Sequence, residues 1–305
     1  MRLMTQHATG LGDVRLTDPI NDVCPGCARA KSHRQPFGSA SNRSNDKLGR
    51  VHTDLCGPIA TQSISGARYL LTFIDDATHY ITVYSIRSKS DTFDQFVNHL
   101  TYVENQSGEK LKILRSDGGG EYINTEMREY LAEKGIRHET TVAETPQQNS
   151  VAERYNRTIF ESIRAIKLSA DVPDELWAEL AITATYLRNR LPTRANQNRE
   201  NISPYEAWYG DQPSIDHLRV IWSDAYAHIS KSKRHKLELR AKKLKLIGYG
   251  DQDGKKAYRL WDQERDRVEI SRNVIFYESI VLSNSQSTLS NIADDEYIIE
   301  AIIGE

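Results

Sequence analysis

Three acidic residues at wide spacing could carry metal-assisted chemistry: Asp54 in "RVHTDL", Asp117 in "LRSDGGGEY" and Glu153 in "NSVAERYNRT". Brought together without an obvious Lys or Arg partner, their carboxylates would repel one another strongly unless cations neutralised them. Oxygen ligands of this kind suit Mg²⁺ or Mn²⁺. A pair of such ions, about 3.5–4 Å apart, can activate a water or hydroxyl and stabilise the leaving oxygen of an in-line phosphoryl displacement.

Each of these acids also has an ordinary interpretation, because the chain contains 42 Asp and Glu residues and an isolated acid is more often structural than catalytic. Glu153 would be exposed in the first turn of a helix whatever the protein did. Asp75 and Asp76 in "FIDDATHY" also follow a strand-like run. We interpret them as turn residues, because Asp favours turns and the following "ATHY" begins a new strand.

The order of predicted elements decides whether the three acids can meet. Strand-like runs "RVHTDL", "RYLLTFID" and "HYITVYSI" precede a helix that starts after Ser90 or Asp91. A strand, a helix, a short strand and a long helix from about Asn149 to Ser169 follow, which gives the order β-β-β-α-β-α-β-α. If the first and fourth strands are neighbours, the ends of these elements bring the three acids together.

Four motifs resemble the integrase core of copia-type long-terminal-repeat retrotransposon polyproteins, in register and in order: "VHTDLCGP", "FIDDATHYITVY", "LRSDGGGEY" and "TPQQNSVAERYNRT". Thirty-five residues separate Asp117 from Glu153, as in the Asp, Asp, Glu triad of that family. Flanking segments extend the resemblance to roughly residues 20–277. It implies a ribonuclease H-like α/β core, which is a five-stranded mixed sheet with flanking helices, a helical extension and a small C-terminal β module.

The resemblance also implies a function. Asp54, Asp117 and Glu153 correspond to the ligands of two Mg²⁺ (or Mn²⁺) ions, which serve 3′-end processing and strand transfer of element DNA into target DNA. No covalent enzyme intermediate is needed. The implied partner is double-stranded DNA, both element ends and target, and the implied setting is a homo-multimer in the nucleus.

Five segments are expected along the chain. They are a truncated pre-integrase zinc segment with a basic arm (1–47), a ribonuclease H-like catalytic core (48–170), a helical extension (171–217), a small basic β module (218–277) and an acidic, disordered linker (278–305) that contains no Lys or Arg.

The N-terminal segment contains half of a zinc site. Cys24 and Cys27 have CxxC spacing, and tetrahedral zinc needs four ligands. The related segment supplies two upstream histidines, whereas His7 is the only histidine before Cys24 here. We therefore expect that Met1 falls inside this module and that the zinc site, although possible, is incomplete. His33 is a weaker alternative ligand because it lies in the basic arm.

Candidate DNA contacts lie near Glu153. Gln148 and Asn149, with the preceding "TPQ", could form a loop against the DNA end, or Asn149 could simply cap the helix. The family usually has Gly where this chain has Ser150. Arg157, together with other basic residues of the long helix, could line DNA phosphates or form a solvated face; these others are Arg154, Arg164 and Lys167.

A second basic stretch, "KSKRHKLELRAKKLK" at 231–245, contains eight Lys or Arg and one Glu, although the net charge of the chain is only −2. Lys242, Lys243 and Lys245 are predicted to bind phosphates because local charge attracts a nucleic-acid backbone. The stretch could equally serve nuclear import.

Other classes of protein are less compatible with the sequence. No apolar run approaches the roughly 20 residues of a membrane span, and three cysteines make no disulfide framework, so we expect an intracellular protein without a membrane partner. The main alternative is a non-catalytic nucleic-acid-binding remnant of a decayed element. A third is a ribonuclease H-type nuclease that cannot join strands, against which the "TPQQNSVAER" match argues.

Overall fold

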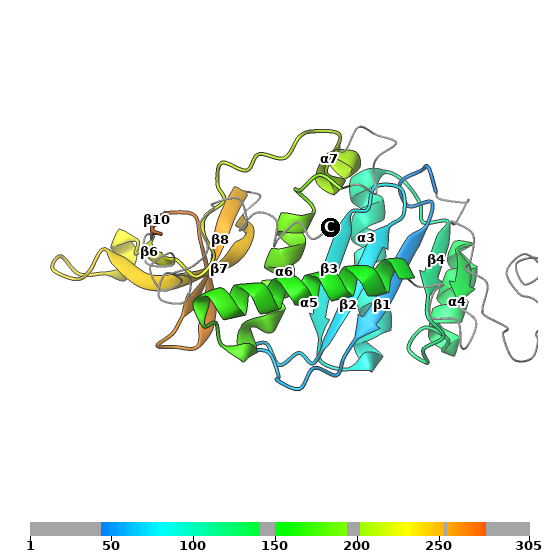
Figure 1. The fold of residues 1–305 in the computed structure, drawn as a ribbon, viewed down its shortest axis with the longest axis horizontal. Coiled ribbons are helices and arrows are strands. Elements are labelled where there is room, and N and C mark those ends of the chain that lie inside the picture. Colours follow the sequence, from blue (N-terminus) through cyan, green and yellow to red (C-terminus); the bar gives the residue numbers. More distant parts are fainter. Residues whose placement is uncertain (1–43, 141–149, 194–201, 253–254, 279–305) are drawn as a thin grey trace, which may run out of the picture. The chain divides into compact units, whose positions relative to one another are not determined.

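The computed structural model describes residues 44–140, 150–193, 202–252 and 255–278 (Figure 1). The predicted zinc ligands Cys24 and Cys27, the loop residues Gln148 and Asn149, and the acidic segment beyond Glu278 lie outside this range. None of the described helices combines the length and the hydropathy that crossing a bilayer would require.

The first sheet has five strands, β1 (Val51–Cys56), β2 (Tyr69–Asp75), β3 (Ile81–Ile86), β4 (Ile113–Ser116) and β5 (Arg137–Thr140). Its order is β3-β2-β1-β4-β5. The first three strands form an antiparallel meander, and β4 and β5 run parallel to β1. This confirms the predicted five-stranded mixed sheet, including the contact between the first and fourth strands.

Helices cover both faces of this sheet. Helices α3 (Thr92–Ser107) and α4 (Thr125–Lys134) pack on one face, and α5 (Ser150–Ala170) packs on the other together with α6 (Trp177–Arg188). Figure 1 shows α5 crossing in front of β1, β2 and β3. The expected helical extension begins as a 3₁₀ turn at Asp174–Leu176 and becomes α-helical at Trp177.

The alternation of side chains along β1 assigns Asp54 to the α5 face. Val51 and Leu55 join the apolar cluster under α3 and α4, whereas Cys56 packs with the cluster under α5. Because successive residues of a strand point to opposite faces, Asp54 shares the face of Cys56. The central strand therefore presents a carboxylate to the N-terminal half of α5.

The turn after β2 confirms the interpretation of Asp75 and Asp76 as structural residues. Asp75 accepts hydrogen bonds from the backbone N–H groups of Leu48 and Thr78, at 2.8 Å each, and from the Thr78 hydroxyl at 2.6 Å. Asp76 accepts a 2.7 Å bond from Ser44 N and pairs with His52 Nε2 at 2.9 Å. Asp75 thus closes the turn through Thr78, and both side chains tie the turn to the chain at and before β1.

The second sheet confirms the predicted small β module. Its strands are β6 (Asp224–His228), β7 (Ala241–Gln252), β8 (Lys255–Asp262), β9 (Arg267–Ser271) and β10 (Val274–Tyr277). They pair antiparallel in the order β10-β6-β7-β8-β9. The apolar side chains of β6, β7 and β8 enclose a core of their own.

Specific contacts join this module to α6. The guanidinium of Arg259 donates two hydrogen bonds to the carboxylate of Glu179, at 2.6 and 2.8 Å. The buried hydroxyl of Thr183 donates to the carbonyl oxygen of Ile247 at 2.7 Å. A Cβ added at Gly248 would lie 2.1 Å from Thr183 Oγ1, so the backbone of β7 approaches the helix too closely for any side chain at this position.

One short helix, α7 (Pro204–Tyr209), was missed by the sequence analysis, which treated the region as part of the chain after the core. Ser203 caps it by accepting a 3.1 Å bond from Glu206 N, and Pro204 occupies its first turn. The "SPYE" pattern is a helix start that the sequence did offer.

Candidate catalytic site

Asp54 is held by a chain of buried hydrogen bonds that joins three elements. The side-chain amide of Asn156, on α5, donates to Asp54 Oδ2 at 2.7 Å. The hydroxyl of Thr72, on β2, donates in turn to Asn156 Oδ1 at 2.6 Å. Thr72 is fully buried and Asn156 nearly so. The orientation of the Asp54 carboxylate is therefore fixed by neutral groups.

The electrostatics of Asp54 shows that the three predicted acids lie in one neighbourhood. Burial is the largest cause that raises the pKa of Asp54, from 3.8 to about 6. The hydrogen bond from Asn156 opposes this rise, while repulsion from Asp117 and from Glu153 adds to it. The fold thus places Asp117 and Glu153 close enough to Asp54 for their negative charges to act on it. For Asp117 this is expected, because β1 and β4 are neighbours.

Asp117 follows the end of β4, where a tight glycine turn surrounds it. Its Oδ1 accepts a 3.0 Å bond from Gly119 N, and its carbonyl oxygen accepts a 2.8 Å bond from the Ser116 hydroxyl. A Cβ added at Gly119 would lie 2.8 Å from the carboxyl carbon of Glu121 and 3.0 Å from Asp117 Oδ1. Glycine at position 119 therefore lets the turn fold back on these acids.

Tyr122 is a further residue of this neighbourhood that the sequence analysis did not single out. Its buried hydroxyl shares a 3.1 Å hydrogen bond with Thr53 Oγ1, next to Asp54 on β1. Burial raises the pKa of Tyr122 well above its ordinary value, and Asp54, Asp117 and Glu121 add to this rise. The phenol therefore stays neutral and ties the glycine turn to the central strand.

Glu153 lies in the first turn of α5, as predicted, and is exposed. Ala152 and Tyr155 on the same turns are buried against the sheet, so the helix is anchored beside the acid. The helix is described only from Ser150, so the predicted start at Asn149 lies outside the described residues.

Carboxylate oxygens are the donors that Mg²⁺ and Mn²⁺ prefer. Here the carboxylates of Asp117 and Glu153 repel that of Asp54. In the described part of the chain, however, no three His, Cys, Asp or Glu side chains stand close enough to hold an ion. The donor set fits hard divalent cations, and the assignment of metal ligands stays a prediction.

The three lysines predicted to bind DNA on β7 have acidic partners. Lys243 and Lys245 each lie 2.7 Å from the buried carboxylate of Asp224. Lys242 pairs with Asp262 and lies 3.1 Å from Glu269. Although burial opposes it, hydrogen bonds from Lys243 and Lys245 lower the pKa of Asp224. Phosphate binding by these lysines stays a prediction, and it would compete with these ion pairs.

On α5, the predicted DNA-binding residue Arg157 is exposed, as are Arg154 and Arg164, whereas Lys167 pairs with Asp174. Exposure permits phosphate contact but does not test it.

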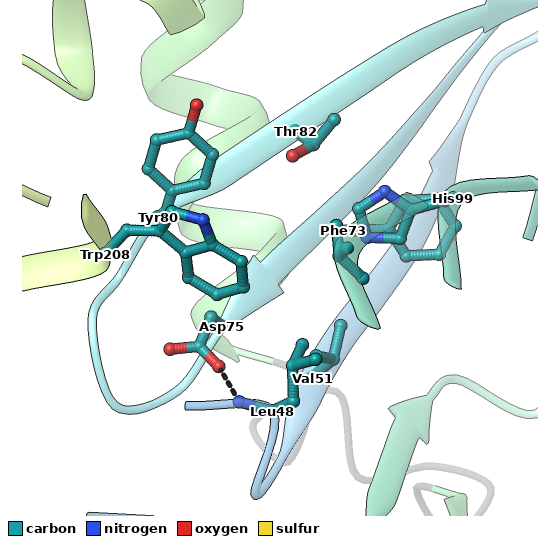
Figure 2. A pocket seen from close by; sticks show the side chains of 9 residues that line it. Leu48, Val51, Phe73, Asp75, Tyr80, Thr82, His99 and Trp208 are labelled. Carbon is teal, nitrogen blue, oxygen red and sulfur yellow. Dashed lines mark hydrogen bonds between the residues drawn. The ribbon is translucent and has the colours of Figure 1, made fainter. Parts of the chain in front are cut away.

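A small pocket lies on the opposite side of the first sheet and contains none of the predicted catalytic residues (Figure 2). In Figure 2 the carboxylate of Asp75 lies below Tyr80 and Trp208 and accepts the bond from Leu48 N. His99 stacks on Phe73 at 4.2 Å between ring centroids. Its apolar lining residues Leu48, Val51, Phe73, Val103 and Trp208 all belong to the cluster under α3 and α4, so this pocket is a gap in the hydrophobic core.

Comparison with known proteins identifies two family domains. Residues 45–146 match the integrase core domain, and residues 223–290 match the retroviral polymerase SH3-like domain. The chain contains an integrase core domain. The matched range includes Asp54 and Asp117, and the integrase core is the ribonuclease H-like sheet expected from the sequence.

Relatives confirm the resemblance to copia-type polyproteins. The chain is 42% identical over 85% of its length to the retrovirus-related Pol polyprotein from transposon TNT 1-94 of Nicotiana tabacum, covering 19% of that protein. It is 30% identical over 59% of its length to the transposon Ty1-DR4 Gag-Pol polyprotein of Saccharomyces cerevisiae, covering 12% of it. The chain thus spans less than one fifth of these relatives.

Among solved structures, the chain is similar to one from a simian T-cell lymphotropic virus intasome in complex with PP2A regulatory subunit B56 gamma. The similarity has a TM-score of 0.48 and 13% sequence identity, and it covers 84% of this chain and 87% of the other. The domain boundaries expected from the sequence stay predictions.

Proposed function

We propose that this integrase chain performs metal-dependent 3′-end processing and strand transfer of element DNA into target DNA. The proposal rests on the environment of the Asp54 carboxylate. Asp54 lies on the central strand of an integrase core, and Asn156 orients its carboxylate. Burial, with repulsion from Asp117 and Glu153, raises its pKa. A carboxylate in this setting favours any cation that neutralises the three acids.

The residues of the chain have distinct roles in the proposed reaction. Asp54, Asp117 and Glu153 supply the oxygen ligands, and Mg²⁺ or Mn²⁺ bound by them would activate the attacking water or 3′-hydroxyl and stabilise the leaving oxygen. Asn156 fixes the direction of the Asp54 oxygens. Because water or the 3′-hydroxyl attacks phosphorus directly, no side chain forms a covalent bond to DNA.

Partners follow from this proposal. The substrate is double-stranded DNA, and the Gln148 and Asn149 region is proposed to contact the element end. Joining both ends of an element requires more than one active site, so we propose a homo-multimer that acts in the nucleus.

The direct test is strand transfer of a short labelled duplex that ends in the element's own terminal sequence, with Mg²⁺ or Mn²⁺. Glu153→Gln should abolish the joined product. Glu161→Gln, an exposed acid two turns further along α5, removes the same charge and should retain the product. If the wild-type protein binds the duplex but yields no product, the non-catalytic nucleic-acid-binding alternative is the better description. If Glu153→Gln joins DNA at the wild-type rate, the triad assignment is wrong.

A further inference from the structure

Three arginines surround one carboxylate on the outer part of the first sheet. Glu139, on the edge strand β5, lies 3.4 Å from Arg50 Nε, 3.4 Å from Arg137 Nη2 and 4.0 Å from Arg115 Nη1. These distances join charged nitrogen and oxygen atoms and exceed those of a close charge-assisted hydrogen bond, about 2.7–2.9 Å. Glu139 therefore attracts all three guanidinium groups without engaging any of them tightly.

The cluster lies beside the candidate catalytic site, on the same face of the sheet. Arg115 is opposite His52 of β1 on one side and Glu139 of β5 on the other. Asp117 follows Arg115 by two residues. Side chains two residues apart along a strand lie on the same face, at a separation of roughly 6.6 Å. We therefore expect Arg115 to lie on the same face as Asp117. A chain of DNA phosphates has spacings of similar size.

The acids of this cluster are few within the described part of the chain. There, the carboxylates within 4.0 Å of Arg50, Arg115 and Arg137 are those of Glu139 and Asp76. Asp76 is largely engaged elsewhere, by the backbone N–H of Ser44 and by His52, and it lies 3.6 Å from Arg50. Among the described residues, Glu139 is therefore the one acid within ion-pair distance of Arg115 and Arg137.

This arrangement differs from that of the β7 lysines. Lys243 and Lys245 each lie 2.7 Å from a nearly buried carboxylate, and a phosphate would have to displace that partner. By contrast, the Arg137 side chain is 73% exposed, and its ion pair with Glu139 is 3.4 Å long. The Arg115 side chain is 27% exposed. A phosphate could approach both guanidinium groups while Glu139 and Arg50 hold them in place.

We propose that Arg115 and Arg137 form a phosphodiester-binding site for the DNA strand whose end reaches Asp54, Asp117 and Glu153. The proposal rests on the proposed integrase function and assigns residues to its DNA contacts. Guanidinium groups suit this task because their planar N–H donors match phosphate oxygens in pairs. Glu139 acts as a positioning residue, since its carboxylate attracts both outer arginines, and Arg50 attracts Glu139 in turn.

The first test measures how the affinity for the terminal duplex depends on salt, in a chelator so that no chemistry occurs. Loss of one phosphate contact should reduce the slope of log K against log salt concentration by about 0.9 for duplex DNA, or about 0.7 for a single strand. Arg137→Gln and Arg115→Gln should each show this change. Arg128→Gln removes the same charge from the exposed surface of α4, on the other face of the sheet, and should keep the wild-type slope.

The second test locates the contact. Uncharged methylphosphonate groups replace single phosphates along each strand near the terminus. One replacement within the last few nucleotides should weaken wild-type binding and have no further effect in Arg137→Gln, because that variant has already lost the interaction. In Arg128→Gln the same replacement should weaken binding as it does in the wild type.

The outcomes separate this inference from the proposed function. If the wild-type protein joins DNA and both arginine variants keep its salt slope, the phosphate site is refuted and the integrase function stands. If the arginine variants reduce the slope and the methylphosphonate effect is lost, but the wild-type protein joins no DNA, the phosphate site stands and the catalytic function fails. If the wild-type protein does not bind the duplex, both are refuted. Because Arg137 is exposed, its variant is expected to fold even if Arg115→Gln does not.

Discussion

Replacing Asp54 with Asn should stabilise the fold at neutral pH, and the effect should vanish in acid. Burial, with repulsion from Asp117 and Glu153, raises the pKa of Asp54 from 3.8 to about 6. A difference of about 2 pKa units corresponds to roughly 3 kcal/mol, at about 1.36 kcal/mol per unit. Between these two values the folded state keeps a proton that the unfolded chain releases. Wild-type stability therefore falls as the pH rises from about 4 to about 6.

Asparagine removes this dependence because it has no charge to desolvate and still offers an oxygen to the Asn156 amide. Urea unfolding of both proteins in a chelator, at several values between pH 4 and 7.5, measures the difference. We expect free energies of unfolding that agree near pH 4 and differ by up to about 3 kcal/mol at pH 7, with the variant more stable. Glu161→Gln, at an exposed position of α5, controls for loss of a charge. An Asp54→Asn variant whose advantage is absent at pH 7, or is the same at pH 4, would refute the reasoning.

Three more predictions follow from buried contacts. Asn156→Leu removes a hydrogen bond to a charged group, of about 1.5–3 kcal/mol, so the pKa of Asp54 should rise by roughly 1 to 2 units. Urea unfolding in a chelator measures this, and a pH dependence of stability identical to that of the wild type would contradict it. Burial lowers the pKa of His99 from 6.5 to about 3. Because the unfolded chain binds a proton that the folded protein does not, stability falls as the pH falls below about 6.5. His99→Phe should flatten this acid dependence in urea unfolding. Gly248→Ala should destabilise the protein by about 1–3 kcal/mol, because the new Cβ clashes with Thr183. In Gly250→Ala the new Cβ would lie 3.3 Å from Cγ of the flexible Arg259 side chain, so the loss of stability in thermal unfolding should be smaller.

The sequence allowed the first sheet and the neighbouring positions of β1 and β4 to be predicted, because local patterns and one topological step were sufficient. β-branched runs indicated the strands, helical spacing indicated α3 and α5, and the proximity of Asp54 and Asp117 required only that β1 and β4 be neighbours. The hydrogen bond that orients Asp54 could not be predicted in this way. It depends on how α5 sits against β1 and β2, which places Asn156 between Asp54 and Thr72.

The basic run at 231–245 shows a different limit of sequence reasoning. Its lysines were counted as available charges, since no acid is near them in the sequence apart from Glu238. In the sheet, Asp224 of β6 lies directly opposite Lys245 of β7, and Lys243 shares its face. Cross-strand partners of this kind are set by register, which the composition of one strand does not reveal.

Asp54, Asp75 and Asp76 differ in the hydrogen-bond and charge partners of their carboxylates. This difference supports a functional rather than a structural role for Asp54. Although burial opposes it, the pKa of Asp76 is lowered to about 2 by His52, by the Ser44 N–H and by Arg50. Burial raises the pKa of Asp75, yet both of its oxygens accept structural hydrogen bonds, one from Leu48 and the other from Thr78. Asp54 instead faces two further acids, so its ionisation costs stability that a cation would restore. A fold that tolerates this cost on its central strand, and uses a buried amide to aim the carboxylate, has the electrostatics of a binding site for positive charge.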